Sequence, residues 1–581
     1  MINSTPNLLE TTARCPGIFA NILGCLRPKE QIATRLTCKV WDNIYQSNLG
    51  LFPRVQSIAG LSKREVFLLY HDLISNPTTP IDNPFLPDIT RRFQETLDPS
   101  GVILGRFLSN LHTVMYRKDS KKGWDFFVSL PIELKETILT LDYSSTTITD
   151  ERLLLALNLC KNVQTLYLAR TAITGDCFSQ ISADNQLKNL NLSDCLNLNE
   201  EKVASFFSKI KALEKLDLSI TGISCKTLLA LDPSNLQELS LNISMLSDEE
   251  KLETFFRRAT SLKTLYLSGY ISDRVLLAID PSKLKKFKIH CQGYREKSLQ
   301  LFLKKAIALE ELNLSESNIT GKALLSIKSN LKSLNLASCS DLNSAILERF
   351  FEKIKTIEAL YLGVTSILVR SLLALDTSKL KILNVKFCKN LDEEIIEDFF
   401  EKANSLQELY IEKVPAVNNI LKAVNPLNLR KLALDSNKNL NETTLENFFS
   451  RSNALEQLFL SHTNINTNSL LFLSSPYLKI LCLNGCLKIN EQKLAEFFSK
   501  TKSLELFSAK GTYITGESLL SLNLSNLKAL ILDRCIHLNQ EALYEFLSKV
   551  KSLKTLHLLQ TPLTDQTRSI LKSIRIQNLI T

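Results

Sequence analysis

The chain has 581 residues, with 44% hydrophobic and 22% charged side chains and a formal net charge of +10 at pH 7. This length exceeds one ordinary domain, although a repeat array can be long without dividing into domains. The basic excess is spread thinly along the chain, which disfavours nucleic-acid binding by charge alone, and no apolar run is long enough to span a membrane.

The thirteen cysteines do not indicate a disulfide framework. Five of them recur at one position of the repeat described below, and others, such as Cys160 and Cys225, show no paired spacing. We therefore expect buried, reduced thiols and no zinc knuckle. Reduced thiols predict a cytoplasmic protein, and a nuclear location stays open.

Residues 1–14 are predicted to be a flexible N-terminus, and residues 15–49 to form two or three short helices. Apolar side chains recur every four residues in the first helix, and a proline stands where the next helix would begin. So small a segment cannot bury all of its apolar side chains, so another surface must cover them. The residues of this pattern are Ile18, Ile22, Leu26, Pro28, Ile32, Cys38 and Trp41.

This segment resembles the F-box. Pro28 and Lys29 match the Pro-Lys pair before the second helix of that family, and Cys38, Lys39 and Trp41 match its Cys-Lys-x-Trp ending. The resemblance implies an all-α domain that docks on the Skp-type adaptor of a cullin–RING ubiquitin ligase, through the seven residues just given. The alternative is an N-terminal helical cap with no adaptor.

Residues 50–137 are predicted to be a helical linker and an N-terminal cap. Helices are expected over 62–75, 89–97 and 102–116, and the four prolines of 76–87 predict an extended connector. A solenoid needs its first repeat sealed. The side chains predicted to seal it are Trp124, Phe126, Phe127 and Leu130.

From residue 138 to 581 the sequence repeats. The unit LKNLNLSDCLNLNEEKVASFFSKIKA at 187–212 recurs every 47 to 49 residues, and a shorter unit, clearest at 213–235, lies between the copies. Nine long and nine short units make about 18 repeats. In each unit, the residues equivalent to Leu190 and Leu192 are expected to point inward from a short strand. In the unit at 187–212, Asn199 is placed to cap the helix that follows. Paired phenylalanines in the helices are expected to fill the core.

The LxxLxL head and a period in the twenties resemble the leucine-rich repeat. The resemblance implies an α/β horseshoe solenoid, with a parallel β-sheet on the concave side and helices on the convex side, following the F-box-like domain. Three residues after the last strand leucine, a small donor is expected to bond the turn of the neighbouring unit. Long units have Cys195, Cys339, Cys388, Cys486 and Cys535 there, and short units have Thr171, Thr221, Thr365, Thr463, Thr512 and Thr561. The cysteine version is similar to the repeat subclass typical of F-box proteins.

Outward residues of the strands would form the concave wall. Five of the nine short units have Tyr or Phe at the middle outward position, and a basic group lies near the centre of the array. Exposed aromatic rings at a fixed phase are typical interface anchors, whereas the alternative is that tyrosine simply favours strands. The predicted target-binding residues are Tyr167, Tyr266, Lys286, Lys288, His290, Tyr361, Phe387, Tyr410, Phe459 and His557.

No catalytic motif, phosphate loop or metal-ligand spacing was found, and the six scattered histidines favour surface positions. We therefore expect a non-catalytic protein without a cofactor. The leading hypothesis is the substrate-recognition subunit of a cullin–RING ubiquitin ligase, with an unknown protein target on the concave face. One alternative is an interaction scaffold unconnected with ubiquitin, since such arrays also resemble bacterial effectors that act in a host cytosol. A third is nucleic-acid binding by the basic group, which we consider disfavoured.

Overall fold

The structure is a computed structural model that describes residues 109, 112–113, 116–117, 120–130, 132–181, 186–243, 248–391, 395–473, 475–550, 553–574, 576 and 578–581. The predicted F-box-like helices of 15–49 and the elements expected over 50–108 lie outside these residues. The chain divides into two compact units, 1–206 and 207–581, and each is described by itself.

Every repeat contributes one short strand, as the alternating pattern predicts, and consecutive strands pair in parallel within each unit. In the first unit the strands are β1 (Thr140–Asp142), β2 (Thr165–Tyr167) and β3 (Asn189–Asn191). In the second they are β4 (Lys215–Leu218), β5 (Glu238–Asn242), β6 (Thr264–Tyr270), β7 (Lys286–Gln292), β8 (Glu311–Asn313), β9 (Ser333–Asn335), β10 (Ala359–Tyr361), β11 (Ile382–Asn384), β12 (Glu408–Tyr410), β13 (Lys431–Ala433), β14 (Gln457–Phe459), β15 (Ile480–Cys482), β16 (Leu506–Ser508), β17 (Ala529–Ile531), β18 (Thr555–His557) and β19 (Asn578–Ile580).

The register places leucine opposite leucine from strand to strand, for example Leu360 opposite Leu383 and Leu383 opposite Leu409. These leucines are buried, and the residues on either side of them face the opposite way. β19 was not predicted. It pairs with β18 although its own three residues are exposed.

Long units carry the longer helices, because a polar N-terminal start and apolar residues at helical spacing support up to three turns. They are α9 (Asp150–Leu159), α10 (Glu200–Lys209), α12 (Glu249–Arg258), α14 (Glu296–Lys305), α15 (Ser344–Lys353), α17 (Ile396–Lys402), α19 (Glu442–Ser450), α20 (Glu491–Lys500) and α21 (Gln540–Lys549). The predicted cap is present, since the Asn199 side chain accepts the Lys202 amide at 3.1 Å. Asn343 and Asn490 cap their helices in the same way.

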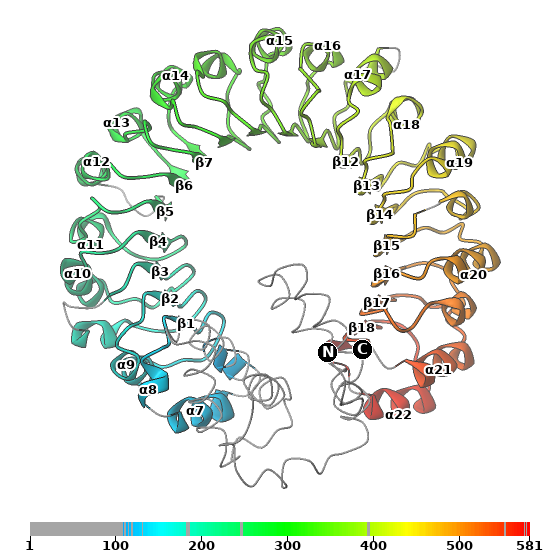
Figure 1. Ribbon diagram of the computed structural model, residues 1–581, viewed down its shortest axis with the longest axis horizontal. Coiled ribbons are helices and arrows are strands. Elements are labelled where there is room, and N and C mark those ends of the chain that lie inside the picture. The colour runs from blue at the N-terminus through cyan, green and yellow to red at the C-terminus, as the bar shows by residue number, and fades with distance from the viewer. Residues whose placement is uncertain are drawn as a thin grey trace, which may run out of the picture. The chain divides into compact units, whose positions relative to one another are not determined.

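Short repeat units form one or two helical turns each, apart from the last repeat, whose helix is longer. They are η2 (Asp176–Gln180), α11 (Cys225–Leu229), α13 (Asp273–Ala278), η3 (Lys322–Ser326), α16 (Val369–Leu373), α18 (Val417–Ala423), η4 (Ser469–Phe472), η5 (Glu517–Ser521) and α22 (Asp565–Ser573). In the second unit the strands line the inner side of a curved array and the helices lie on its outer side (Figure 1). We call the strand side that points away from the helices the inner face.

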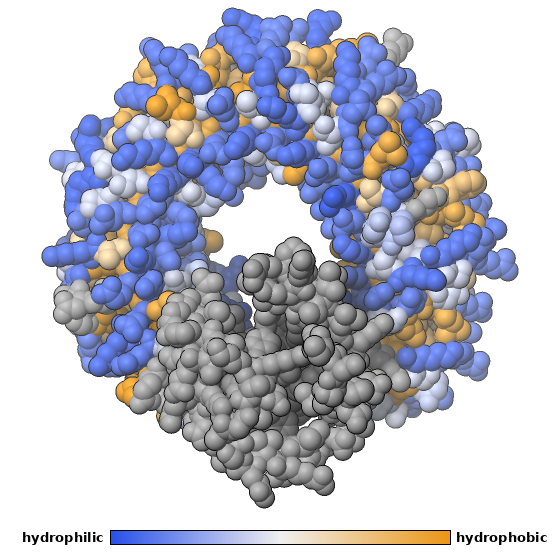
Figure 2. All heavy atoms as spheres, viewed as in Figure 1, coloured by the Kyte–Doolittle hydropathy of each residue, from blue (hydrophilic) through white to orange (hydrophobic). Residues whose placement is uncertain are grey.

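The paired phenylalanines fill the space between strands and helices, as predicted. Phe255, Phe256, Phe399 and Phe400 are each no more than 1% exposed. On the visible side of the second unit, apolar residues reach the surface in separate patches among hydrophilic ones (Figure 2). None of the helices in the described residues has the length and hydrophobicity that a membrane-spanning segment requires.

The predicted ladder of small donors is present, with one correction. The Cys388 thiol donates to the Leu362 carbonyl of the preceding unit at 3.1 Å, and the other four ladder cysteines do the same. Thr365, however, donates to that same Leu362 carbonyl, which belongs to its own unit. Thr171, Thr221, Thr463 and Thr512 also bond within their own units, and only Thr561 reaches the preceding one.

An asparagine at the ladder position was missed. Asn437 donates to the carbonyls of Ile411 and Leu434 at 2.8 and 2.9 Å and accepts the Val414 amide at 2.9 Å. One side chain thus serves three backbone groups, where a cysteine serves one.

Ahead of β1, a helical segment seals the sheet edge of the first unit. The hydroxyls of Ser109 and Thr113 donate to the carbonyls of Thr140 and Asp142 in β1, which have no preceding strand to bond. These residues fall within the helix predicted over 102–116. Two further helices follow, α7 (Ser120–Ser129) and α8 (Ile132–Lys135).

Two of the predicted cap residues, Phe127 and Leu130, are buried, and Trp124 is half-buried beneath the Arg152 guanidinium. The prediction that the histidines lie on the surface is wrong for His112, which is 1% exposed. Its imidazole nitrogens lie 3.1 Å from the Gly123 carbonyl and 2.9 Å from the Tyr143 hydroxyl. These two partners make burial of a polar ring tolerable.

Candidate protein-binding face

The inner face presents three side chains per strand, because the residues before, between and after the two buried strand leucines point away from the core. The third outward residue is followed by a turn residue in the left-handed conformation, with φ between 51° and 65° in fifteen of the eighteen units. Side chains of one position therefore form rows across neighbouring strands. These rows, not single residues, define the candidate site.

The predicted aromatic residues lie at the middle position of these strands. In the first unit, Tyr167 ends β2 and is 39% exposed. In the second, Tyr266 is also 39% exposed, whereas four others are half-buried. Those four are Tyr361, Tyr410, Phe459 and His557.

Phe387 differs from its predicted place. It lies three residues beyond β11, at the left-handed turn position with φ 58°, and is 39% exposed. It therefore projects from the turn at the strand end and not from the wall. Val364 occupies the same turn position after β10 and is 50% exposed, in a conformation that β-branched residues rarely adopt. Exposed apolar groups thus extend past the strand ends here.

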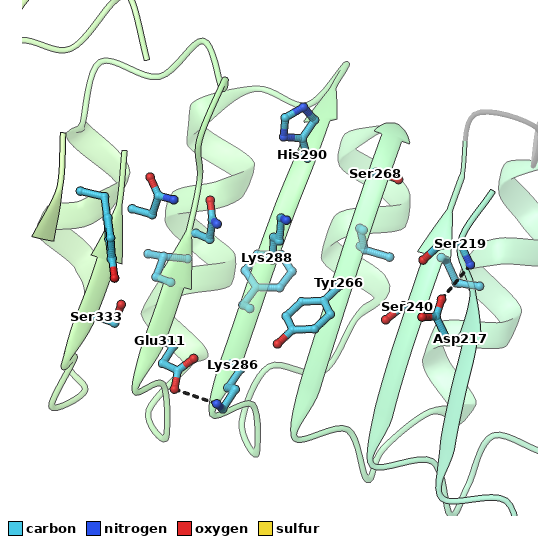
Figure 3. A pocket seen from close by; sticks show the side chains of 17 residues that line it. Asp217, Ser219, Ser240, Tyr266, Ser268, Lys286, Lys288, His290, Glu311 and Ser333 are labelled. Carbon is cyan, nitrogen blue, oxygen red and sulfur yellow. Dashed lines mark hydrogen bonds and ion pairs between the residues drawn. The ribbon is translucent and has the colours of Figure 1, made fainter. Parts of the chain in front are cut away.

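A hollow of about 830 Å³ lies on the inner face over β4–β10 (Figure 3). Tyr266 and Lys288 are opposite each other on β6 and β7, and Figure 3 shows both side chains in the floor of the hollow. Hydroxyl and amide groups surround them. We call this region the central hollow; its polar lining includes Ser219, Ser240, Ser268, Asn313, Ser333 and Asn335.

The three basic residues predicted here all come from β7, but two of them have acidic partners. Lys286 pairs with Glu311 at 2.8 Å, which raises the pKa of its ammonium group, and the His290 ring lies 2.9 Å from Glu316. Among the described residues, Lys288 forms no ion pair. The predicted basic group is therefore one free cation in a polar hollow, which suits a hydrogen-bonding or acidic loop of a partner.

A second cluster lies over β10–β14, which we call the aromatic row: Tyr361, Tyr410 and Phe459. The Tyr410 hydroxyl donates to Glu408 at 2.7 Å, and burial with this hydrogen bond raises the pKa of Tyr410 above its usual range. The Lys431 ammonium lies 5.0 Å from the Tyr410 ring centre and 5.5 Å from that of Phe459. Burial raises the carboxyl pKa of both Glu412 and Asp435 at the strand ends.

Sequence reasoning missed two features of this face. Beyond the aromatic row, three outward positions of β15–β17 hold apolar, half-buried side chains, those of Ile480, Leu506 and Ile531. Along the opposite strand ends, lysines of long units alternate with glutamates of short units, as in the Lys332–Glu310 and Lys381–Glu358 pairs at 2.7 and 2.6 Å. The fixed repeat position of each residue was the signal that could have revealed both.

The seven residues predicted to bind the adaptor, Ile18, Ile22, Leu26, Pro28, Ile32, Cys38 and Trp41, lie outside the described residues. Ten of the thirteen cysteines lie within the described ranges, and none of these ten forms a disulfide. No group of three or more possible metal ligands occurs in that part of the chain.

Parallel strands stacked by an LxxLxL repeat, with helices opposite and a row-patterned inner face, define a leucine-rich-repeat solenoid. Comparison of the sequence with protein-family models and with curated proteins found no match.

Solved structures with a similar fold do exist. The chain covers 80% of a chain of the mouse RP105/MD-1 complex (19% identity, TM-score 0.44, 78% of this chain). It covers 62% of a chain of the TLR13–ssRNA13 complex (19%, 0.36, 73%) and 92% of a chain of the Rad7 and Elc1 complex in yeast (15%, 0.37, 73%). Each likeness is below 25% identity and a TM-score of 0.5, so none of them bears on the function of this chain.

Proposed function

We propose that the chain is a non-catalytic receptor that binds a target protein on its inner face. The observation that supports this most strongly is the face itself. Aromatic, basic and amide side chains stand in register over β4–β14, around a hollow of about 830 Å³. Aromatic anchors within a polar surround are the typical composition of a protein interface.

We further propose that residues 15–49 dock on a Skp-type adaptor, so that the target is brought to a cullin–RING ubiquitin ligase. The support is the F-box-like pattern that ends in Cys38 and Trp41. A receptor of this kind acts by positioning, because tethering the target raises the effective concentration of its lysines near the catalytic subunit. This activity belongs to the eukaryotic cytosol, where the reduced thiols of the repeats would be stable.

Binding of the purified full chain to a purified Skp-type adaptor tests the docking step. The parent chain should form a stable complex. Leu26→Asp should weaken it by about a hundredfold or more, since a charge at an apolar anchor must be desolvated without a partner. Leu301→Asp makes the same change at a 46% exposed position of the outer helix α14, so it is the matched control and should bind as the parent does.

Equal binding by the Leu26→Asp and parent chains would overturn the docking assignment. A parent chain that never binds the adaptor would leave an interaction scaffold without ubiquitin as the function.

A further inference from the structure

The aromatic row contains two gaps at corresponding positions of the repeat, each between two aromatic residues. Aromatic side chains of the short units alternate with small side chains of the long units, in the register Tyr361, Asn384, Tyr410, Ala433 and Phe459. Neighbouring strands lie about 4.8 Å apart, so successive rings flank a gap of about two spacings. We call the gap over Asn384 the β11 slot and the gap over Ala433 the β13 slot.

The β13 slot already contains a cation. Lys431, the first residue of β13, places its ammonium 5.0 Å from the Tyr410 ring centre and 5.5 Å from the Phe459 ring centre. Both distances are within the range of favourable cation–π contact. Within this molecule, therefore, a pair of rings in this geometry binds an ammonium group.

The β11 slot also lies between two aromatic residues, Tyr361 and Tyr410, but it lacks that cation. Ile382 stands in β11 where Lys431 stands in β13, and among the described residues no cation lies over the Tyr361 ring. Lys386, two residues beyond β11, lies over Gly363 after β10, since its Cγ lies 2.9 Å from where a β-carbon on that glycine would be. The slot therefore has aromatic walls and an amide floor at Asn384.

Negative charge borders this slot from β12. Glu408 accepts the Tyr410 hydroxyl, and Glu412 has one buried carboxylate oxygen for which no hydrogen-bond donor exists among the described residues. An unpaired buried carboxylate oxygen is costly, and an ammonium or guanidinium group in the slot would stabilise this carboxylate electrostatically. Burial raises the carboxyl pKa of Glu412, while the charges of Lys386 and Lys431 oppose that shift only in part.

We propose that the β11 slot receives a lysine or arginine side chain of the protein bound on the inner face, with Glu408 and Glu412 as its counter-charges. This inference rests on the proposed binding of a protein to the inner face and adds the chemistry of the contact. The neighbouring β13 slot, filled by Lys431, is the template for the complex.

The test places a lysine in the β11 slot at the position that Lys431 occupies in β13. Acetylated hexalysine amide is titrated into the full chain by isothermal calorimetry, and saturable binding is expected. Ile382→Lys supplies an internal ammonium and should weaken binding by about fivefold or more. Ile480→Lys makes the same charge change at the same strand position in β15 and should stay within about twofold of the parent.

A second pair of variants tests the ring. Tyr361→Leu should weaken binding by about fivefold or more, whereas Tyr361→Phe keeps the aromatic face and should stay within about twofold. Thermal unfolding midpoints confirm that each variant is folded.

Three results would overturn the proposal: no binding of hexalysine, equal weakening by Ile382→Lys and Ile480→Lys, or parent-like binding by Tyr361→Leu. Binding that arises only in Lys386→Met would identify Lys386 as the resident cation and would also overturn it. The assay contains no adaptor, so its outcome is independent of F-box docking.

Discussion

At the scale of single residues, one repeat position decides how the turns are held. The residue three places after the last strand leucine is buried in most units and, where it is cysteine, threonine or asparagine, donates to a turn carbonyl. Cys388 and Thr365 share the Leu362 carbonyl, so each partly duplicates the other. Asn437 has no such duplicate, because it alone pairs the Val414 amide.

The ladder residues should therefore differ in the cost of removal. Asn437→Ala leaves the Val414 amide and the Ile411 carbonyl without a partner and should destabilise the array by about 3 kcal/mol. Cys388→Ala leaves Leu362 bonded to Thr365 and should cost about 1 kcal/mol. Urea unfolding followed by circular dichroism gives both values, and an equal cost would show that the shared carbonyl does not matter.

At the scale of elements, the alternation of long and short units organises both the helix layer and the inner face. Long units supply the longer helices and short units supply the aromatic rings, so two strands form the true period of the surface. The first unit also has an element outside this period, the helical cap. There His112 faces the Gly123 carbonyl, the Tyr143 hydroxyl and the rings of Tyr116 and Phe127.

The cap should loosen in acid. Burial lowers the pKa of His112 from 6.5 to about 4, so the unfolded state binds the proton more tightly than the folded state does. The contribution is complete above pH 6.5 and falls by roughly 1.4 kcal/mol per pH unit as the pH drops from 6.5 towards 4.

Trp124 fluorescence in a Trp41→Phe background reports this change, because the chain has only two tryptophans. His112→Gln removes the titrating group and should flatten the pH profile over that interval. An unchanged profile in the variant would mean that another group controls the cap.

At the scale of the whole molecule, the leucine spacing was sufficient to predict the parallel strands, the buried face and the helix layer, because period and burial follow from the residues of one unit. Contacts between neighbouring repeats were harder to predict from the sequence. The sequence places Lys286 and His290 on the inner face, but their pairing with Glu311 and Glu316 depends on register across strands. The predicted target-binding residues were chosen partly because their side chains are aromatic, so Ile480 and Leu506 were not included. Their position in the repeat places them on the inner face equally well.

The central claim, that one chain bridges an adaptor and an inner-face target, has a direct test. A photo-crosslinking amino acid replaces Tyr266 in the central hollow or Lys304 on the outer helix α14, in the parent and in Leu26→Asp. After irradiation in a eukaryotic extract, the covalent adducts are purified and probed for the Skp-type adaptor. We expect a discrete target adduct from position 266 only, with the adaptor present for the parent and absent for Leu26→Asp. Adducts that form equally from position 304, or a position-266 adduct that lacks the adaptor in the parent, would contradict the account.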